Sequence, residues 1–121
     1  MCETVPRIRI RPVNRGQVRP EAGWVLYWMS AARRPSWNFS LDRAIWWAER
    51  LRKPLAVVET FACDEPWMNP RHAAFLLGGM EDNAAALAGK QIAYRPLVAA
   101  GSAALGRGLA ELAGEACLVV A

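Results

Sequence analysis

Short apolar runs that alternate with amphipathic stretches constrain the fold of this chain more than any other feature. The runs are WVLYWM at 24–29, LAVVETF at 55–61, QIAYRPLV at 91–98 and CLVVA at 117–121. They are rich in residues that favour buried strands, and stretches of helical periodicity separate them. The order strand, helix, strand, helix, strand, helix, strand favours right-handed crossovers and a parallel sheet. We therefore expect a three-layer α/β/α, Rossmann-like open sheet with about four strands.

Each expected helix has a polar residue at its start that can accept hydrogen bonds from the first backbone N–H groups. These N-cap candidates are Asn38 or Ser40, then Asn69, which precedes Pro70, and then Ser102. The residues expected to end the helices are Pro54, Gly89 and Gly114. The expected buried faces are Leu41, Ala44, Ile45, Ala48 and Leu51 in the first helix, Ala73, Leu76, Leu77, Met80, Ala84 and Leu87 in the second, and Leu105, Leu109 and Leu112 in the third.

Positive charge is concentrated in the front of the chain. Residues 1–54 contain 11 Lys and Arg against 4 Asp and Glu, whereas residues 55–121 contain 4 against 7. Residues 1–22 carry several prolines and arginines, which favours a basic, extended lead-in over a helix. A polyanion such as nucleic acid can recognise this asymmetry, and a solvated arm with no partner is the alternative.

Several classes of protein are disfavoured by composition. No run approaches the roughly 18 apolar residues of a membrane span, and the N-terminus lacks the apolar core of a signal peptide. Cys2, Cys63 and Cys117 are far apart and odd in number, which indicates reduced thiols and a cytoplasmic location. Because His72 is the only histidine, we expect no metal site.

The residues also argue against common catalytic and cofactor chemistry. The turn after the first strand, SAARRPSWN, has no G-x-G-x-x-G fingerprint for a dinucleotide. No serine has a histidine near it in sequence, so a hydrolase is not indicated. Six tryptophans stand out, and Trp46 and Trp47 cannot both point inward because they are consecutive on a helix. For Trp37 and Trp67, on expected loops, a stacking platform and ordinary packing both stay open.

The stretch VLYWMSAARRPSWNFSLDRAIWWAERLRKPLAVVE, residues 25–59, resembles the start of the DNA photolyase and cryptochrome family, and it is most similar to class II cyclobutane-pyrimidine-dimer photolyases. The strand VLYWM is followed by a loop with Arg33, Arg34 and Asn38 and then by KPLAVVE, as in that family. RHAAFLLGGMEDNAAAL, residues 71–87, is similar to the family's next helix. Glu59 and Thr60 depart from it, since the family strand is usually more apolar there.

The resemblance implies that residues 23–121 are the N-terminal α/β domain of a light-dependent DNA repair flavoprotein. In the family this domain can hold a light-harvesting antenna, a deazaflavin or a folate. The antenna site implied here lies after the first two strands, and its expected lining is Met29, Ser30, Arg33, Asn38, Thr60, Phe61 and Cys63. FAD, the lesion pocket and DNA binding belong to a C-terminal helical domain in the family. We therefore expect no FAD, no catalytic residue and no activity in these 121 residues alone.

The last residues form an apolar strand with no cap or polar tail after it, from which we expect the α/β domain to continue beyond Ala121. The expected partners are then the chain's own C-terminal helical domain and, through the full-length protein, DNA. An uncovered edge at this strand, or the surface of Trp46 and Trp47, would let the chain form homo-oligomers. The alternative is a free-standing Rossmann-like module that binds a small ligand or oligomerises without enzymatic activity.

Overall fold

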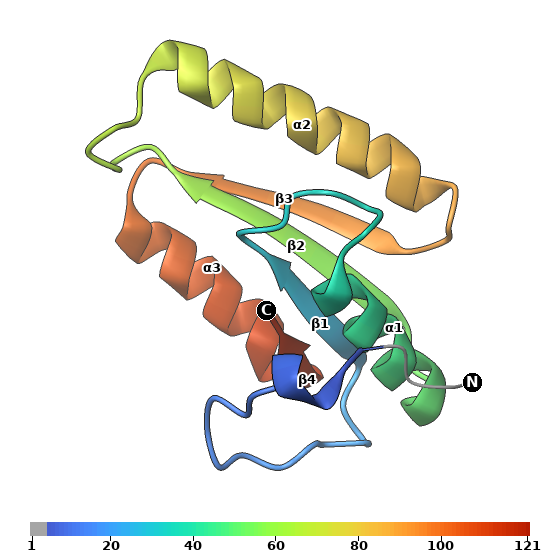
Figure 1. Ribbon diagram of the computed structural model, residues 1–121. Coiled ribbons are helices and arrows are strands. Elements are labelled where there is room, and N and C mark those ends of the chain that lie inside the picture. The colour runs from blue at the N-terminus through green and yellow to red at the C-terminus, as the bar shows by residue number, and fades with distance from the viewer. Residues whose placement is uncertain (1–4) are drawn as a thin grey trace.

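A computed structural model of the chain describes residues 5–121 and contains a four-stranded, all-parallel sheet with strand order β3-β2-β1-β4 (Figure 1). The elements in chain order are the 3-10 turn η1 (Arg7–Arg9), β1 (Trp24–Met29), α1 (Phe39–Leu51), β2 (Leu55–Ala62), α2 (Pro70–Ala88), β3 (Ala93–Ala99), α3 (Ser102–Gly114) and β4 (Ala116–Val120). The fold class predicted from the sequence is confirmed. Cys2 lies outside the described residues.

Strand β1 lies in the interior of the sheet, between β2 and β4. It pairs with β2 in the register Val25↔Leu55 and with β4 in the register Val25↔Leu118, with one irregularity between Trp24 and Val25. Because β1 is covered on both faces and both edges, its apolar run is continuous rather than alternating. This position explains why WVLYWM carries the strongest strand signal in the sequence.

The two faces of the sheet are covered by different helices, which gives three layers (Figure 1). Alternate residues of β1, Val25, Tyr27 and Met29, belong to a core cluster with α1 and with Leu87 at the end of α2. The intervening Leu26 packs on the opposite face with Leu109 and Leu112 of α3. The helix α3 lies on the second face because the chain crosses from β3 at one edge to β4 at the other, and this crossover passes over the free face.

The helix starts confirm two of the expected caps and correct the third. Asn38 and Asn69 accept hydrogen bonds from Leu41 N and His72 N, so Asn38 rather than Ser40 caps α1. Ser102 was expected to cap α3, but it is the first helical residue, and Gly101 is the N-cap without a side-chain bond. The cap comes instead from Asp64, whose carboxylate accepts from Ser102 N at 2.9 Å and from the Ser102 hydroxyl at 2.8 Å.

The buried face of α2 is narrower than the sequence predicts. Met80 and Leu87 are buried as expected, but Leu77 is 46% exposed, and the polar Asn83 is buried in its place. Phe75, two residues before Leu77, is 78% exposed.

The lead-in is tied to the last strand by Arg19. Its backbone N–H donates to Cys117 O, and its guanidinium donates to Gly114 O at 2.9 Å and Ala116 O at 2.8 Å. The bond to Gly114 O satisfies a carbonyl at the C-terminus of α3, where a cation is also favoured by the helix dipole. Apart from η1, the described part of the lead-in has no helix or strand.

Candidate functional site

An open cleft of about 400 Å³ lies beyond the carboxyl ends of β1 and β2. In parallel sheets of this kind ligands bind at that end of the strands, and the volume is within the range of small-ligand pockets. The cleft is lined by Trp28, Ser30, Arg33, Thr60, Phe61, Ala62, Glu65, Trp67, Met68, His72, Leu76 and Leu105. These residues come from both strands, from the loops that follow them, and from α2 and α3.

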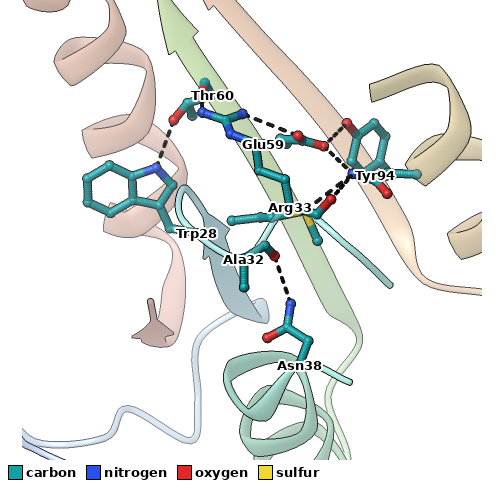
Figure 2. Close-up of polar contacts among 9 residues, drawn as sticks. Trp28, Ala32, Arg33, Asn38, Glu59, Thr60 and Tyr94 are labelled. Atoms are coloured by element: carbon teal, nitrogen blue, oxygen red, sulfur yellow. Dashed lines mark hydrogen bonds and ion pairs between the residues drawn. The ribbon is translucent and has the colours of Figure 1, made fainter. Parts of the chain in front are cut away.

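Two indoles provide the aromatic walls of the cleft. The Trp28 ring is fixed because its Nε1–H donates to Thr60 Oγ1 at 2.8 Å (Figure 2). Trp67 lies on the loop between β2 and α2 and is 69% exposed. One wall is therefore held rigidly by the sheet and the other is accessible to solvent, an arrangement suited to a planar ligand that enters from outside.

A buried glutamate organises the floor next to the cleft. Glu59 on β2 is 1% exposed, and its Oε1 accepts from Tyr94 Oη–H at 2.6 Å and from Asn83 Nδ2 at 2.8 Å. Its Oε2 forms an ion pair with Arg33 at 3.2 Å, and Arg33 also donates to Thr60 O at 2.7 Å. Figure 2 shows the guanidinium between these two residues. A buried carboxylate needs such partners to offset its lost hydration.

This network joins four elements of the chain. Arg33 comes from the loop after β1, Glu59 from β2, Asn83 from α2 and Tyr94 from β3. The carboxylate therefore fixes the guanidinium of Arg33 at the rim of the cleft, where a quarter of the Arg33 side chain is exposed. The remaining N–H groups of that guanidinium are the strongest fixed donors available to an anionic or carbonyl-bearing ligand.

The loop between β1 and α1 turns without a glycine because Asn38 holds it together. The side chain of Asn38 is buried, and its Nδ2 donates to Ala32 O and Arg34 O at 3.0 Å each and to Tyr27 Oη at 2.9 Å. Its Oδ1 caps α1 at the same time. One side chain thus satisfies the loop carbonyls, the buried phenol and the helix start.

Burial and hydrogen bonding change the acidity of the two tyrosines in this region. The pKa of Tyr94 is raised first by burial and then by its hydrogen bond to the Glu59 carboxylate and the charge of that group. The pKa of Tyr27 is also raised by burial, and the bond from Asn38 opposes that shift. Both phenols therefore stay protonated at neutral pH, and Tyr94 acts as a donor to Glu59.

The structure brings together four of the seven residues expected to line the antenna site. Ser30, Arg33, Thr60 and Phe61 line the cleft. Met29 is fully buried in the core cluster, and Asn38 is buried as the cap described above. Cys63 is exposed but is not among the lining residues. The part that any of these side chains plays in binding stays a prediction.

The other lining residues did not follow from the sequence. Trp28 packs beside α3 on the second face of the sheet, so its place in the cleft depends on how α3 crosses the sheet. Leu105 and Leu76 come from two different helices, and His72 lies on the first turn of α2. For Trp67 the sequence left both ordinary packing and a stacking platform open. In the structure this indole is exposed at the cleft, where its ring is accessible for stacking.

The cleft does not carry an evident reaction centre. Its only histidine is His72, and no hydrogen bond joins that ring to the Ser30 hydroxyl among the described contacts. Within residues 5–121, no group of three or more His, Cys, Asp and Glu side chains is placed to hold a metal ion. Over the same residues, no helix is both long and apolar enough to cross a membrane.

Comparison with known proteins gives one informative similarity. The chain is 42% identical over 74 residues to a deoxyribodipyrimidine photo-lyase of Methanothermobacter thermautotrophicus. This match supports membership of the photolyase family. It covers 61% of the chain but only 17% of that photolyase, so the chain corresponds to a small part of its length. No family model matches the chain.

Proposed function

We propose that this chain is the N-terminal α/β domain of a class II-type photolyase, and that its cleft holds a light-harvesting chromophore, a deazaflavin or a folate. The observation that carries the proposal is the identity of 42% over 74 residues to a deoxyribodipyrimidine photo-lyase. The position of the cleft at the carboxyl ends of β1 and β2 agrees with it, because small ligands occupy that place in open α/β sheets.

The lining of the cleft fits the physical needs of an antenna. Such a chromophore absorbs light and transfers the energy, so the site must hold it in a fixed orientation without reacting with it. Trp28, locked to Thr60, offers a rigid aromatic face, and Trp67 offers a second face from the loop. Arg33, held by Glu59, supplies a fixed positive group for an acidic tail or a ring carbonyl.

Reconstitution tests this proposal directly. The purified chain is titrated with 8-hydroxy-5-deazaflavin and, separately, with a reduced folate, and binding is followed by quenching of tryptophan emission and by induced circular dichroism of the chromophore. We expect saturable binding of one of the two. Replacement of Trp67 by alanine should weaken it by about three- to tenfold, the value of one aromatic contact.

Trp37→Ala is the matched control, because Trp37 is 92% exposed and does not line the cleft. It should leave chromophore affinity unchanged. Absence of binding of both chromophores, or equal losses in the two variants, would contradict an antenna role for this cleft.

The repair reaction itself is proposed for the full-length protein and not for these residues. In this proposal FAD, the lesion site and DNA binding belong to a helical domain, and the α/β domain packs against it. The isolated chain should therefore neither bind FAD stoichiometrically nor reverse pyrimidine dimers under blue light. Stoichiometric binding of FAD, or reversal of dimers, by the purified 121-residue chain would contradict the proposed roles of the two domains.

A free-standing module is the second candidate, and the exposed apolar residues of α2 favour it. Phe75 is 78% and Leu77 46% exposed on the N-terminal half of that helix. Exposed apolar side chains of this size are available for contact with a partner. The two proposals differ in chromophore binding, since a module that only oligomerises should bind neither the deazaflavin nor the folate.

A further inference from the structure

A row of exposed or half-buried aromatic rings, each accompanied by arginine, runs from the loop after β1 along α1. Trp37 is 92% exposed and lies next to Arg34, whose Nε donates to the Trp37 carbonyl at 3.0 Å. Phe39 is 45% exposed, and the guanidinium carbon of Arg9 lies 4.6 Å above its ring centroid. We call this row, with the Trp46 group described next, the α1 ridge.

Trp46 extends the ridge along the helix. Arg43 and Arg50 place their guanidinium carbons 4.5 Å and 5.2 Å from the centroid of its ring. Trp47 meets Trp46 edge to face, with centroids 4.9 Å apart, and packs against the core. Phe39 and Trp46 are seven residues apart, so they lie on the same side of the helix about 10 Å from each other along its axis.

Trp37 is exposed on a loop that is held in place by hydrogen bonds. Its φ is 53°, a left-handed conformation that a bulky residue adopts at an energetic cost. The loop is nevertheless fixed by the bonds of Asn38 to its carbonyls and by Lys90 Nζ, which donates to Pro35 O at 3.2 Å. The left-handed conformation of Trp37 therefore costs some stability, and in that conformation its indole is exposed to solvent.

The charge around the ridge is positive. Residues 1–54 hold 11 Lys and Arg against 4 Asp and Glu. Arg19 and Arg33 are committed to internal contacts, but Arg9, Arg34 and Arg50 are exposed at the ridge. The acidic groups on the outer surface of α1 are Asp42 and Glu49, both exposed on one flank. The cations therefore outnumber the acids beside the rings.

We propose that the α1 ridge binds single-stranded nucleic acid. A guanidinium held over a ring can still direct N–H groups to phosphate oxygens, and the contact with the ring already restricts the side-chain freedom that binding would otherwise remove. The uncovered indole of Trp37 offers a face on which an unpaired base can stack. Alternation of cations and aromatic rings is how proteins bind single strands without reading their sequence.

This inference goes beyond the antenna proposal and does not depend on it. The ridge is built from the lead-in, the loop after β1 and the outer surface of α1, whereas the cleft is lined from β1, β2, the loops that follow them, α2 and α3. The two sites share the loop after β1 but use different residues of it, since Ser30 and Arg33 line the cleft and Arg34 and Trp37 belong to the ridge. Trp37 does not line the cleft, and Trp67 does. Each site can therefore be disabled while the other is kept intact.

Fluorescence anisotropy with a labelled 12-nucleotide oligo-dT tests the proposal on the full 121-residue chain. The observed affinity should fall with salt, with a slope of about 0.7 per phosphate contact. The double variant Arg9→Gln/Arg50→Gln should reduce that slope by about 1.4 and weaken binding about 25-fold at 0.1 M salt. Trp37→Ala should weaken binding at least about fivefold with the salt slope unchanged, because stacking releases no counterions.

Matched variants outside the α1 ridge control for general effects. Phe75→Ala removes another exposed ring, and Arg95→Gln/Arg107→Gln removes two exposed arginines of β3 and α3. The Phe75 variant should leave oligo-dT affinity unchanged, and the arginine pair should change it less than threefold. Circular dichroism of each variant checks that it is folded.

Four results would overturn the proposal. The first is absence of oligo-dT binding at low salt. The second is equal loss of affinity in the ridge and control arginine variants, which would indicate net charge alone. The third is binding of polyglutamate or heparin with the same affinity and with no effect of Trp37→Ala, which would indicate an acidic protein or polysaccharide as the partner. Preference for a blunt duplex over oligo-dT would also contradict it.

Discussion

Replacement of Glu59 by glutamine should destabilise the fold through three contacts that the amide cannot all reproduce. Two of the donors, Tyr94 Oη–H and Asn83 Nδ2, meet the same oxygen, Oε1. A glutamine can keep its own Oε1 there, but its Nε2 then replaces the oxygen that faces Arg33 at 3.2 Å. Two N–H donors would point at each other, and the ion pair would be lost.

The magnitude follows from the type of each contact. Two hydrogen bonds to a charged group become bonds to a neutral one, which loses about 1 kcal/mol each. Loss of the Arg33 pair adds about 1 kcal/mol, since part of that side chain is in water. The amide recovers some of this because it has no charge to bury. We expect a net loss of about 2 kcal/mol, and about 3–5 kcal/mol for Glu59→Ala, which leaves all three partners unpaired.

Urea unfolding followed by tryptophan fluorescence measures these changes, provided that the m-value stays constant. Glu111→Gln, an exposed glutamate on α3, is the control and should shift stability by less than about 0.5 kcal/mol. Tyr94→Phe should cost about 2 kcal/mol in the wild type but only about 1 kcal/mol beside Glu59→Gln, because its acceptor there is neutral. A stable Glu59→Gln variant with equal Tyr94→Phe costs in both backgrounds would refute the proposed network.

Four further outcomes test other parts of the structure. Asn38→Ala should cost about 2–4 kcal/mol, whereas Asn38→Asp keeps the cap and should cost less; equal losses in urea titrations would count against the capping role. Because the pKa of Tyr94 is raised above its ordinary 10.0, its contribution is present below pH 10 and is lost as the pH rises further, so Tyr94→Phe should lose less stability under alkaline conditions. The pKa of Asp64 is lowered by its bonds from Ser102, so Asp64→Ala should melt below the wild type at neutral pH, and the gap should close as the pH falls below 3.8; a constant gap would contradict this. If the chain self-associates through the free edge of β4, Val119→Lys should make it monomeric in light scattering, since Val119 is 43% exposed there, and an unchanged oligomer would point to another surface.

The elements of the fold were predictable because they depend on local signals. The apolar run at 24–29 and the Asn69-Pro70 pair define a strand and a helix start within a few residues, and both lie where the sequence placed them. The start of α3 was not predictable in the same way. Its cap is Asp64, which is 38 residues earlier in the chain, and no local pattern around Ser102 indicates that carboxylate.

The candidate site was only partly predictable for a related reason. Residues at the end of a strand or directly after it, such as Phe61 and Ser30, could be assigned to the carboxyl end of the sheet. Leu105 could not, because its place depends on the crossover of α3 to the second face. Glu59 could be noticed in the sequence because it is a charged residue within an apolar strand. Its partners Asn83 and Tyr94 could not be predicted, because they come from elements whose packing the sequence does not specify.

The pairing of β1 with β4 has a consequence for how the protein is made. The strand at the interior of the sheet is synthesised early, but its neighbour on one side, Ala116–Val120, is the last element of the 121 residues. During translation β1 can pair with β2, and β2 with β3, while the other edge of β1 stays open because the residues of β4 have not yet been added. The carbonyl of Ala116 that accepts a bond from Arg19 is also absent at that stage. A nascent chain arrested before residue 116 therefore carries a strongly apolar strand with one open edge, the kind of intermediate that chaperones bind and that aggregates when they are scarce.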